Sequence, residues 1–471
     1  MAQIEAMADI YAGASLVVVA AHGDSASAGL AGITSVRSRI QYRESVRGIE
    51  LSTYYDRAMD LEKSKWSSRA WTFQERHLAH RCLIFTASGA MLVAGRHVWE
   101  EAKYGSMARV PSRDIPTIGL GYDDDGFDCN ARYARSVGLY TARSLSEPTD
   151  ILNAYKGLLQ IMRDSFRGSF VHGLPISEID FALHWRPAHR QMIEPIRFRR
   201  RMSKNGKRLF PSWSWAGWDG PVSLEAVPAG LYSRVRWIDS TNQPVGTSEL
   251  KGLKPVKLDH EGSEGGNEPK CCDQADLHAD VGLLTLIGGE GLHVEVMLAS
   301  FKREAGMRDT DDDAHPSVTL EERILLHDAN GNGAGHISAL RSTTTIGEEG
   351  SRYECIALCR VRNNASEPEE YDAEVEYDRW YVTDREECDM SACQGRDRLD
   401  TSCMRDPWGR EWLDTEQYDA TEPWCRYSVM LISRKPDPDG GPDLASRCGL
   451  RYCHIDGFYT VAPKWTRLQL V

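Results

Sequence analysis

The stretch that most constrains the fold of this chain is Trp66–Arg76, which reads WSSRAWTFQER. Ser64 or Ser67 can serve as the N-cap of a helix here. Helical spacing then places Trp66, Ala70 and Phe73 on one apolar stripe. Aromatic rings bury a large area per residue, so a short helix with several of them needs more than one packing partner. We therefore expect this segment to be a packing hub.

The length and composition describe a globular protein with room for two or three domains, since 471 residues can bury more than one core. Fifty-six basic residues against sixty-nine acidic ones give a net charge of -13, which argues against nucleic acid as a general partner. The longest apolar runs are far shorter than the roughly 20 residues of a membrane-spanning helix. Twelve cysteines without a secretory signal indicate reduced thiols, so we expect a cytoplasmic location.

The N-terminal residues predict a helix, a strand and a loop. Apolar residues recur at helical spacing over 4–11, and Gly13 is placed to end that helix. The following run, Leu16–Ala20, is apolar at every position, which is typical of a strand inside a parallel sheet with helices on both faces. Only one helix precedes this strand. The pattern therefore predicts that an earlier part of the domain is missing and that the chain is N-terminally truncated.

The next segments predict a hairpin and a helix. Two apolar runs, 81–86 and 90–94, flank a Ser-Gly pair, as in a hairpin. Pro148 opens a helix whose apolar positions run from Ile151 to Met162. The basic stretch 186–208 is interpreted as a solvated loop, with a nuclear-localisation or phosphate-binding patch as the alternative.

The second half of the chain begins with the tryptophan-rich stretch 210–220, FPSWSWAGWDG, in which Trp213 and Trp215 alternate as on a strand. Helical periodicity then gives way to short apolar runs separated by long acidic loops, which predicts a β-rich region. The predicted strands are 283–287, 294–298, 323–327, 354–358, 427–433 and 458–461. The predicted organisation is an α+β chain with domains at 1–105, 106–220 and 221–471.

Two segments have a partial metal-site pattern. The loop Asp328–Gly333 resembles the first half of a calcium loop, but Ala339 occupies position twelve, where a glutamate is needed, so a hairpin turn is preferred. The alternative is a composite zinc site formed by Cys388, Cys393, Cys448, Cys453 and His454. Neither cysteine pair has the two-residue spacing of a zinc knuckle. Buried thiols are the preferred interpretation, and no metal or other cofactor is predicted.

Glu75 is the carboxylate that most deserves a functional test, because it lies among arginines on the aromatic segment. An ion pair with Arg69, Arg76 or Arg81 is the simpler interpretation. The sequence contains neither a Gly-x-Ser-x-Gly elbow nor a recognisable Ser/His/Asp or Cys/His spacing. No catalytic residue is therefore predicted.

Together these segments resemble the fungal heterokaryon-incompatibility (HET) domain proteins. Trp66–Glu75 is similar to the late HET motif Trp-x-x-Arg-x-Trp-Thr-x-Gln-Glu, and Ile4–Val19 is similar to a helix and strand of that domain. Leu145–Gly157 and Pro211–Trp218 resemble segments found beyond the domain. The motif residues, for which the resemblance implies a structural role, are Trp66, Arg69, Trp71, Thr72, Gln74, Glu75, Pro211, Trp213, Trp215 and Trp218.

The resemblance also has implications for fold and function. HET proteins begin with a Ser-Tyr-x-Trp-Gly-type segment and an Ile-Asp-x-x-Cys-Ile strand, and neither is present here, as a truncated member would show. The implied fold is a partial Rossmann-like or TIR-like domain, a helical connector and a β-rich region. The implied role is fungal non-self recognition and programmed cell death, through other proteins of that pathway. The alternatives are a TIR-like enzyme that hydrolyses NAD or another nucleotide, and a metal-stabilised binding module.

Overall fold

The structure is a computed structural model, which describes sixteen stretches of the chain. These are residues 6–37, 42–53, 55, 57–95, 97–101, 107–110, 129–166, 169–188, 198–224, 231–238, 244–245, 291–302, 321–340, 352–361, 413–419 and 425–471. Helices and strands are mixed along them, so the α+β prediction is confirmed. None of the helices in these stretches has the length and apolar character that a membrane crossing requires.

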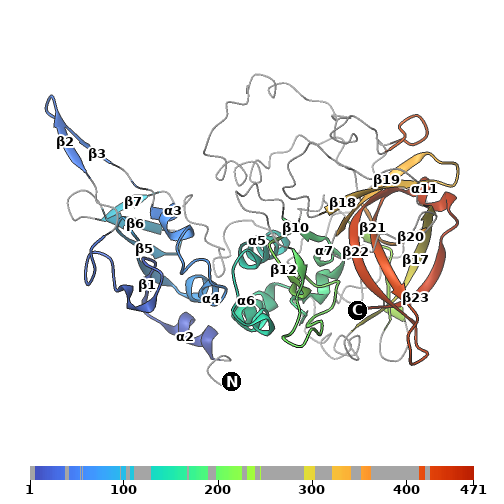
Figure 1. Ribbon diagram of the computed structural model, residues 1–471, viewed down its shortest axis with the longest axis horizontal. Helices are drawn as coiled ribbons and strands as arrows, with labels where there is room; N and C mark the ends of the chain where they lie inside the picture. Colours follow the sequence, from blue (N-terminus) through green and yellow to red (C-terminus); the bar gives the residue numbers. More distant parts are fainter. Residues whose placement is uncertain are drawn as a thin grey trace.

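An N-terminal sheet of five strands lies at one end of the molecule (Figure 1). Its order is β1-β4-β5-β6-β7, and only the β1–β4 pair is parallel. The strands are β1 (Val17–Ala20), β4 (Arg81–Phe85), β5 (Ala90–Ala94), β6 (His97–Glu101) and β7 (Met107–Val110). The predicted hairpin is confirmed as β4 and β5. Nothing here confirms a Rossmann-like or TIR-like arrangement.

Strand β1 is the edge of this sheet in the described residues, because it pairs only with β4. Val19 faces a small core formed with α3 (Arg57–Glu62) and the other strands, whereas Val18 is 53% exposed. The prediction of a strand covered on both faces is therefore wrong for this structure. Continuous apolar sequence does not by itself reveal which face will be covered. The preceding helix, α2 (Met7–Gly13), ends near the predicted glycine. A separate hairpin, β2 (Arg43–Val46) and β3 (Ile49–Ser52), projects from this end (Figure 1).

A helical layer lies between the N-terminal sheet and the C-terminal strands (Figure 1). Its helices are α5 (Cys129–Thr141), α6 (Lys156–Ser165) and α7 (Ile179–Ala182), with short 3-10 turns at Pro148–Asp150, Asn153–Tyr155 and Ile176–Glu178. Pro148 opens this stretch, but as a 3-10 turn, and the α-helix begins only at Lys156, later than predicted. The predicted apolar positions Ile151, Tyr155, Leu158 and Met162 are all buried.

The C-terminal strands close into a five-stranded barrel. The pairings run β17–β20–β21–β22–β23 and return to β17, so each of the five strands has two neighbours in this ring. The strands are β17 (Leu292–Lys302), β20 (Arg352–Val361), β21 (Arg426–Lys435), β22 (Asp443–His454) and β23 (Lys464–Leu470). A hairpin of β18 (Glu321–His327) and β19 (Gly333–Leu340) is attached to β22. The ring buries one core inside it, which includes Phe301, Val429 and Phe458.

Most of the strand predictions for this region are confirmed. The runs 294–298, 323–327, 354–358 and 427–433 all lie within strands, and 283–287 lies outside the described residues. The prediction for 458–461 is wrong, because α11 (Ile455–Thr460) occupies it. Since β22 and β23 are parallel, the chain needs a crossover between them, and α11 supplies it.

Short strands connect the layers. They are β8 (Phe170–Val171), β9 (Leu174–Pro175), β10 (Trp185–Pro187), β11 (Arg199–Arg200), β12 (Trp218–Asp219), β13 (Val222–Leu224), β14 (Leu231–Ser233), β15 (Arg236–Ile238) and β16 (Pro244–Val245). One large core runs from Ala70 to Leu470 and joins the helical layer to the outer face of the barrel. The predicted division at 105 and 220 stays a prediction.

Candidate functional site

The aromatic segment joins two cores. Trp66 packs against the core of the N-terminal sheet, while Ala70, Phe73 and Leu78 belong to the large core of the helical layer and barrel. The expected packing hub is therefore present, although Trp71 is only partly buried.

The helix in this segment starts later than predicted. It is α4 (Trp71–Leu78), and the predicted starts at Ser64 and Ser67 are wrong. The residues before Trp71 bond elsewhere: the Ala70 amide donates to the Ser144 carbonyl at 2.9 Å, and the Ser144 amide donates to the Ser68 carbonyl at 2.7 Å. These bonds to a distant segment replace bonds that a longer helix would make along itself.

Gln74 clamps the helical layer from inside the core. Its Nε2 donates to the Asn153 carbonyl at 3.1 Å, and its Oε1 accepts the Gly157 amide at 3.1 Å. A Cβ at Gly157 would lie 2.4 Å from Gln74 Oε1, so the close approach depends on glycine. The motif glutamine thereby fixes the first turn of α6.

Arg143 also binds the first motif. Its Nη1 donates to Thr72 Oγ1 at 3.1 Å and to the Arg69 carbonyl at 3.3 Å, and its Cζ lies 4.8 Å from the centre of the Phe73 ring. Burial, together with the neighbouring Arg76, lowers the pKa of Arg143 to about 10. The group stays charged at neutral pH and can act as a fixed donor.

Glu75 makes contacts different from the predicted ion pair. Its Oε2 accepts the Trp66 Nε1 proton at 3.3 Å, while Arg76 pairs with Glu62 at 2.7 Å. The Tyr11 hydroxyl of α2 also bonds Glu75, and the pKa of Tyr11 is raised by burial and then by this carboxylate. Glu75 therefore ties α2 to the turn before α4, and the predicted pairing with Arg69, Arg76 or Arg81 is wrong.

The second motif, Pro211–Trp218, is a set of turns around a 3-10 helix (Trp215–Gly217), so the predicted strand alternation is wrong. Trp213, Trp215 and Trp218 are almost completely buried, and each indole N–H finds an acceptor. Trp213 donates to the Leu470 carbonyl at 3.1 Å and Trp218 to the Ser212 carbonyl at 2.9 Å. Buried indoles with satisfied N–H groups are typical of a rigid core.

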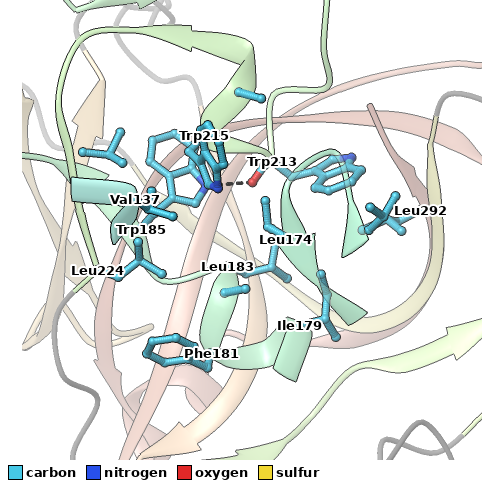
Figure 2. Packing of buried hydrophobic residues seen from close by; sticks show 14 of the residues in the cluster. Val137, Leu174, Ile179, Phe181, Leu183, Trp185, Trp213, Trp215, Leu224 and Leu292 are labelled. Atoms are coloured by element: carbon cyan, nitrogen blue, oxygen red, sulfur yellow. Dashed lines mark hydrogen bonds between the residues drawn. The ribbon is translucent and has the colours of Figure 1, made fainter. Parts of the chain in front are cut away.

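Trp185, which lies outside both motifs, completes the packing around Trp213. Its indole N–H donates to the Trp213 carbonyl at 2.7 Å (Figure 2). Arg447 lies over the Trp185 ring at 3.9 Å and donates to the Leu183 carbonyl at 2.7 Å and to the Trp185 carbonyl. The C-terminal barrel strand β22 is thereby attached to this motif core.

The two motifs meet through tyrosines that the sequence did not single out as a group. Tyr140 lies 5.4 Å from Phe73 and 6.1 Å from Trp215, measured between ring centres. Tyr155 stacks on Tyr140 at 4.6 Å, and Trp215 Nε1 donates to the Tyr133 hydroxyl at 2.9 Å. Segments more than a hundred residues apart in the chain therefore form one aromatic cluster. The helical spacing of Tyr155 was the only sequence signal for it.

In its described parts, 186–188 and 198–208, the basic stretch is only partly solvated, contrary to the prediction, and residues 189–197 lie outside the described residues. Arg199 and Lys204 are exposed and pair with Asp219 and Glu147. Arg201, by contrast, is buried and donates to the Trp218 carbonyl at 2.8 Å. Burial and nearby Arg208 lower the pKa of Arg200 to about 10. Arg201 therefore binds backbone carbonyls of the second motif and Arg200 binds the Phe210 carbonyl next to it, so these arginines do not form a uniform patch.

A buried His–Ser–Cys cluster was missed from the sequence. His184 Nε2 lies 2.7 Å from Ser428 Oγ and 3.5 Å from Cys359 Sγ, and its Nδ1 lies 2.6 Å from the Asp180 carbonyl. The carbonyl can only accept, so Nδ1 carries the proton and Ser428 donates to Nε2. The three side chains are almost completely buried, which suits a structural connection between α7 and the barrel better than turnover of a substrate.

The two alternative metal sites, for calcium and for zinc, find no support among the described residues. Asp328 accepts bonds from the Asn330 and Asn332 amides at 2.8 Å and from the Tyr418 hydroxyl at 2.7 Å, which confirms a hairpin turn between β18 and β19. Within the stretches that the structure describes, no group of three or more His, Cys, Asp or Glu residues is placed to hold a metal ion. Cys388 and Cys393 of the composite zinc hypothesis lie outside those stretches.

The fold and the two motifs define a mixed α/β protein whose N-terminal segment is anchored in a shared aromatic core. Residues 1–75 match the family model described as heterokaryon incompatibility protein (HET), and the match ends at Glu75, the last residue of the first motif. The chain is a HET domain-containing protein, and this match indicates a role in heterokaryon incompatibility. No curated protein and no solved structure matches it.

Proposed function

We propose that this protein is a signalling or cell-death component of fungal non-self recognition that acts in the cytoplasm through protein interactions. The observation that carries the proposal is the HET match at residues 1–75, together with the way its final motif is anchored. Gln74 and Arg143 connect that motif to the helical layer, whose core continues into the barrel. A partner that displaced the N-terminal segment would therefore strain contacts throughout this core.

The packing of the motif residues supports an interaction role over catalysis. Thr72 and Gln74 use their side chains on backbone groups and on Arg143, and the three motif tryptophans are enclosed. Glu75 holds Trp66 and Tyr11. These packing contacts and hydrogen bonds support the proposal that the motif residues have a structural role.

The proposal can be tested by regulated expression in a filamentous fungus. We expect growth arrest and uptake of a vital dye in cells that express the full chain. A Gln74→Leu variant, which removes both hydrogen bonds of the clamp, should lose the effect, and Lys63→Ala, an exposed change in the same region, should retain it. A fluorescent tag belongs at the N-terminus, because the Leu470 and Val471 carbonyls bond the second motif.

Two outcomes would contradict this proposal. Unchanged growth and viability at a protein level confirmed by blotting would argue against a cell-death role. Depletion of NAD by the purified protein, at a rate that follows protein concentration, would support the alternative of a nucleotide-hydrolysing enzyme.

A further inference from the structure

One end of the barrel carries two arginines that each lie over an aromatic ring. Arg236 Cζ lies 4.1 Å from the centre of the Trp465 ring, and Arg234 Cζ lies 5.7 Å from the centre of the Tyr427 ring. Such stacking is favourable because the ring face carries negative charge density. It holds both guanidinium groups at the rim of the barrel.

Tyr459 links the two pairs. Its hydroxyl donates to Met297 Sδ at 3.7 Å and lies 3.3 Å from the Tyr427 hydroxyl, so Tyr427 must be the donor in that second bond. Trp465 lies directly opposite Met297 in the β17–β23 pair. The contacts therefore form a continuous series from Arg234 to Arg236 that passes through Met297. We call Arg234, Arg236, Tyr427, Tyr459 and Trp465 the arginine–aromatic ring.

Arg236, Tyr459 and Trp465 of this ring are exposed, Arg234 is partly exposed and Tyr427 is buried beneath it, and the ring carries excess positive charge. Tyr459 is 50% exposed and Trp465 is 46% exposed, which is high for two large rings in contact with a core. Glu295 serves both Arg236, at 3.1 Å, and Arg467, at 3.7 Å. Within the described stretches, no carboxylate lies within ion-pair distance of Arg234. The local excess of positive charge contrasts with the net charge of -13 of the whole chain.

Tryptophan, tyrosine and arginine are the residues enriched where protein interfaces derive most of their affinity. Excess positive charge at such a place selects a negatively charged partner. We propose that the arginine–aromatic ring binds an acidic peptide segment of a partner protein. Carboxylates of the peptide pair with Arg234 and Arg236, and an apolar side chain rests on Trp465 and Tyr459.

Single-stranded nucleic acid is disfavoured by the same contacts. Stacked bases need a row of free ring faces, but Arg236 already covers one face of Trp465, and Tyr427 is buried. The negative charge of the chain as a whole also opposes a polyanion. A peptide with a few carboxylates needs only the two arginines and the exposed edge of the ring.

A binding titration tests the proposal on the full chain. The probe is a fluorescein-labelled peptide of alternating glutamate and tyrosine, followed by fluorescence anisotropy. We expect saturable binding that weakens with added salt and that is lost with a peptide of alternating lysine and tyrosine. The double variant Arg234→Gln/Arg236→Gln and the variant Trp465→Ala should each bind about tenfold more weakly or worse.

Matched controls keep the result interpretable. Arg352→Gln removes an exposed barrel arginine near the far end of β17 and should bind like the wild type. Arg236→Lys keeps the charge but loses the planar stacking, and should show an intermediate affinity in a chain that melts like the wild type.

Three results would overturn the proposal: no binding of the acidic peptide, an equal loss in Arg352→Gln, or tighter binding of an oligothymidylate strand than of the peptide. This inference rests on the proposed function in one respect: the ring is the surface through which the proposed protein interactions would take place. If the acidic peptide does not bind but expression still arrests growth, only the peptide-binding proposal is contradicted. If the peptide binds but expression does not arrest growth, only the cell-death role is contradicted.

Discussion

Acidification should destabilise this protein through His184. In the folded chain the ring is buried, its Nδ1 is bonded to the Asp180 carbonyl, and its Nε2 accepts a proton from Ser428. Protonation would place a second N–H where a hydroxyl already donates, close to the positive charge of Arg447. Burial, and secondarily Arg447, lowers the pKa of His184 to about 4.

The sign and size of the effect follow from that value. The pKa in the unfolded chain is the ordinary 6.5, above the folded value, so the unfolded state takes up the proton first. The contribution of His184 to stability is complete above pH about 6.5 and is lost as the pH falls towards about 4. At about 1.4 kcal/mol per pKa unit, the loss amounts to about 3 kcal/mol.

The assay is guanidinium unfolding followed by the fluorescence of the buried tryptophans, at neutral pH and at pH about 4.5. His184→Gln removes the titrating group, and we expect it to lose about 3 kcal/mol less than the wild type on acidification. His80→Gln, an exposed change, should behave like the wild type. Burial also lowers the pKa of His77, so both proteins lose further stability and the difference between them isolates His184. Equal losses in the wild type and His184→Gln would refute the reasoning.

Other predictions concern the core contacts. Phe73→Ala should lower the free energy of unfolding by about 3–5 kcal/mol because the ring is fully buried, whereas Trp71→Ala should cost clearly less; equal costs in chemical unfolding would contradict the packing described. Gly157→Ala should cost about 1–3 kcal/mol, since its Cβ would meet Gln74 Oε1 at 2.4 Å, and an unchanged melting temperature would rule out that close approach. Arg447→Met should cost at least about 2 kcal/mol, because the Leu183 and Trp185 carbonyls would be left buried without a donor; a variant as stable as the wild type would show that apolar packing replaces them.

The sequence predicted elements well where local periodicity decides the structure. The hairpin of β4 and β5, the buried positions from Ile151 to Met162 and the turn at Asp328 depend on neighbouring residues. Periodicity gave wrong predictions where contacts with residues distant in sequence determine the local structure. The segment before Trp71 leaves the helix because the Ala70 amide and the Ser68 carbonyl both bond Ser144, a competition that no local pattern records. Residues 458–461 are helical because two parallel strands need a crossover there.

The contacts of the candidate site were less predictable than its residues. The motif identified Gln74 and Trp215, but only the fold shows that Tyr140 and Tyr155 link the two motifs. His184, Ser428 and Cys359 are brought together by three separate elements, so no spacing along the chain could reveal them. Glu75 was expected to pair with arginine, yet the indole of Trp66 lies closer to it. Ion-pair predictions from sequence fail when a neutral donor occupies the available space.

The position of β23 has a consequence for the order of assembly during synthesis. This strand is the last in chain order, and it completes the barrel by pairing with β17. The Leu470 and Val471 carbonyls then accept bonds from Trp213 and Ser212 of the second motif. A nascent chain can form the N-terminal sheet early, but the tryptophan core stays open until β23 and Val471 have left the ribosome. The barrel and the motif core should therefore be completed late, after the N-terminal sheet has formed, and the Ala70–Phe73 end of the HET-matching segment reaches its final packing only then.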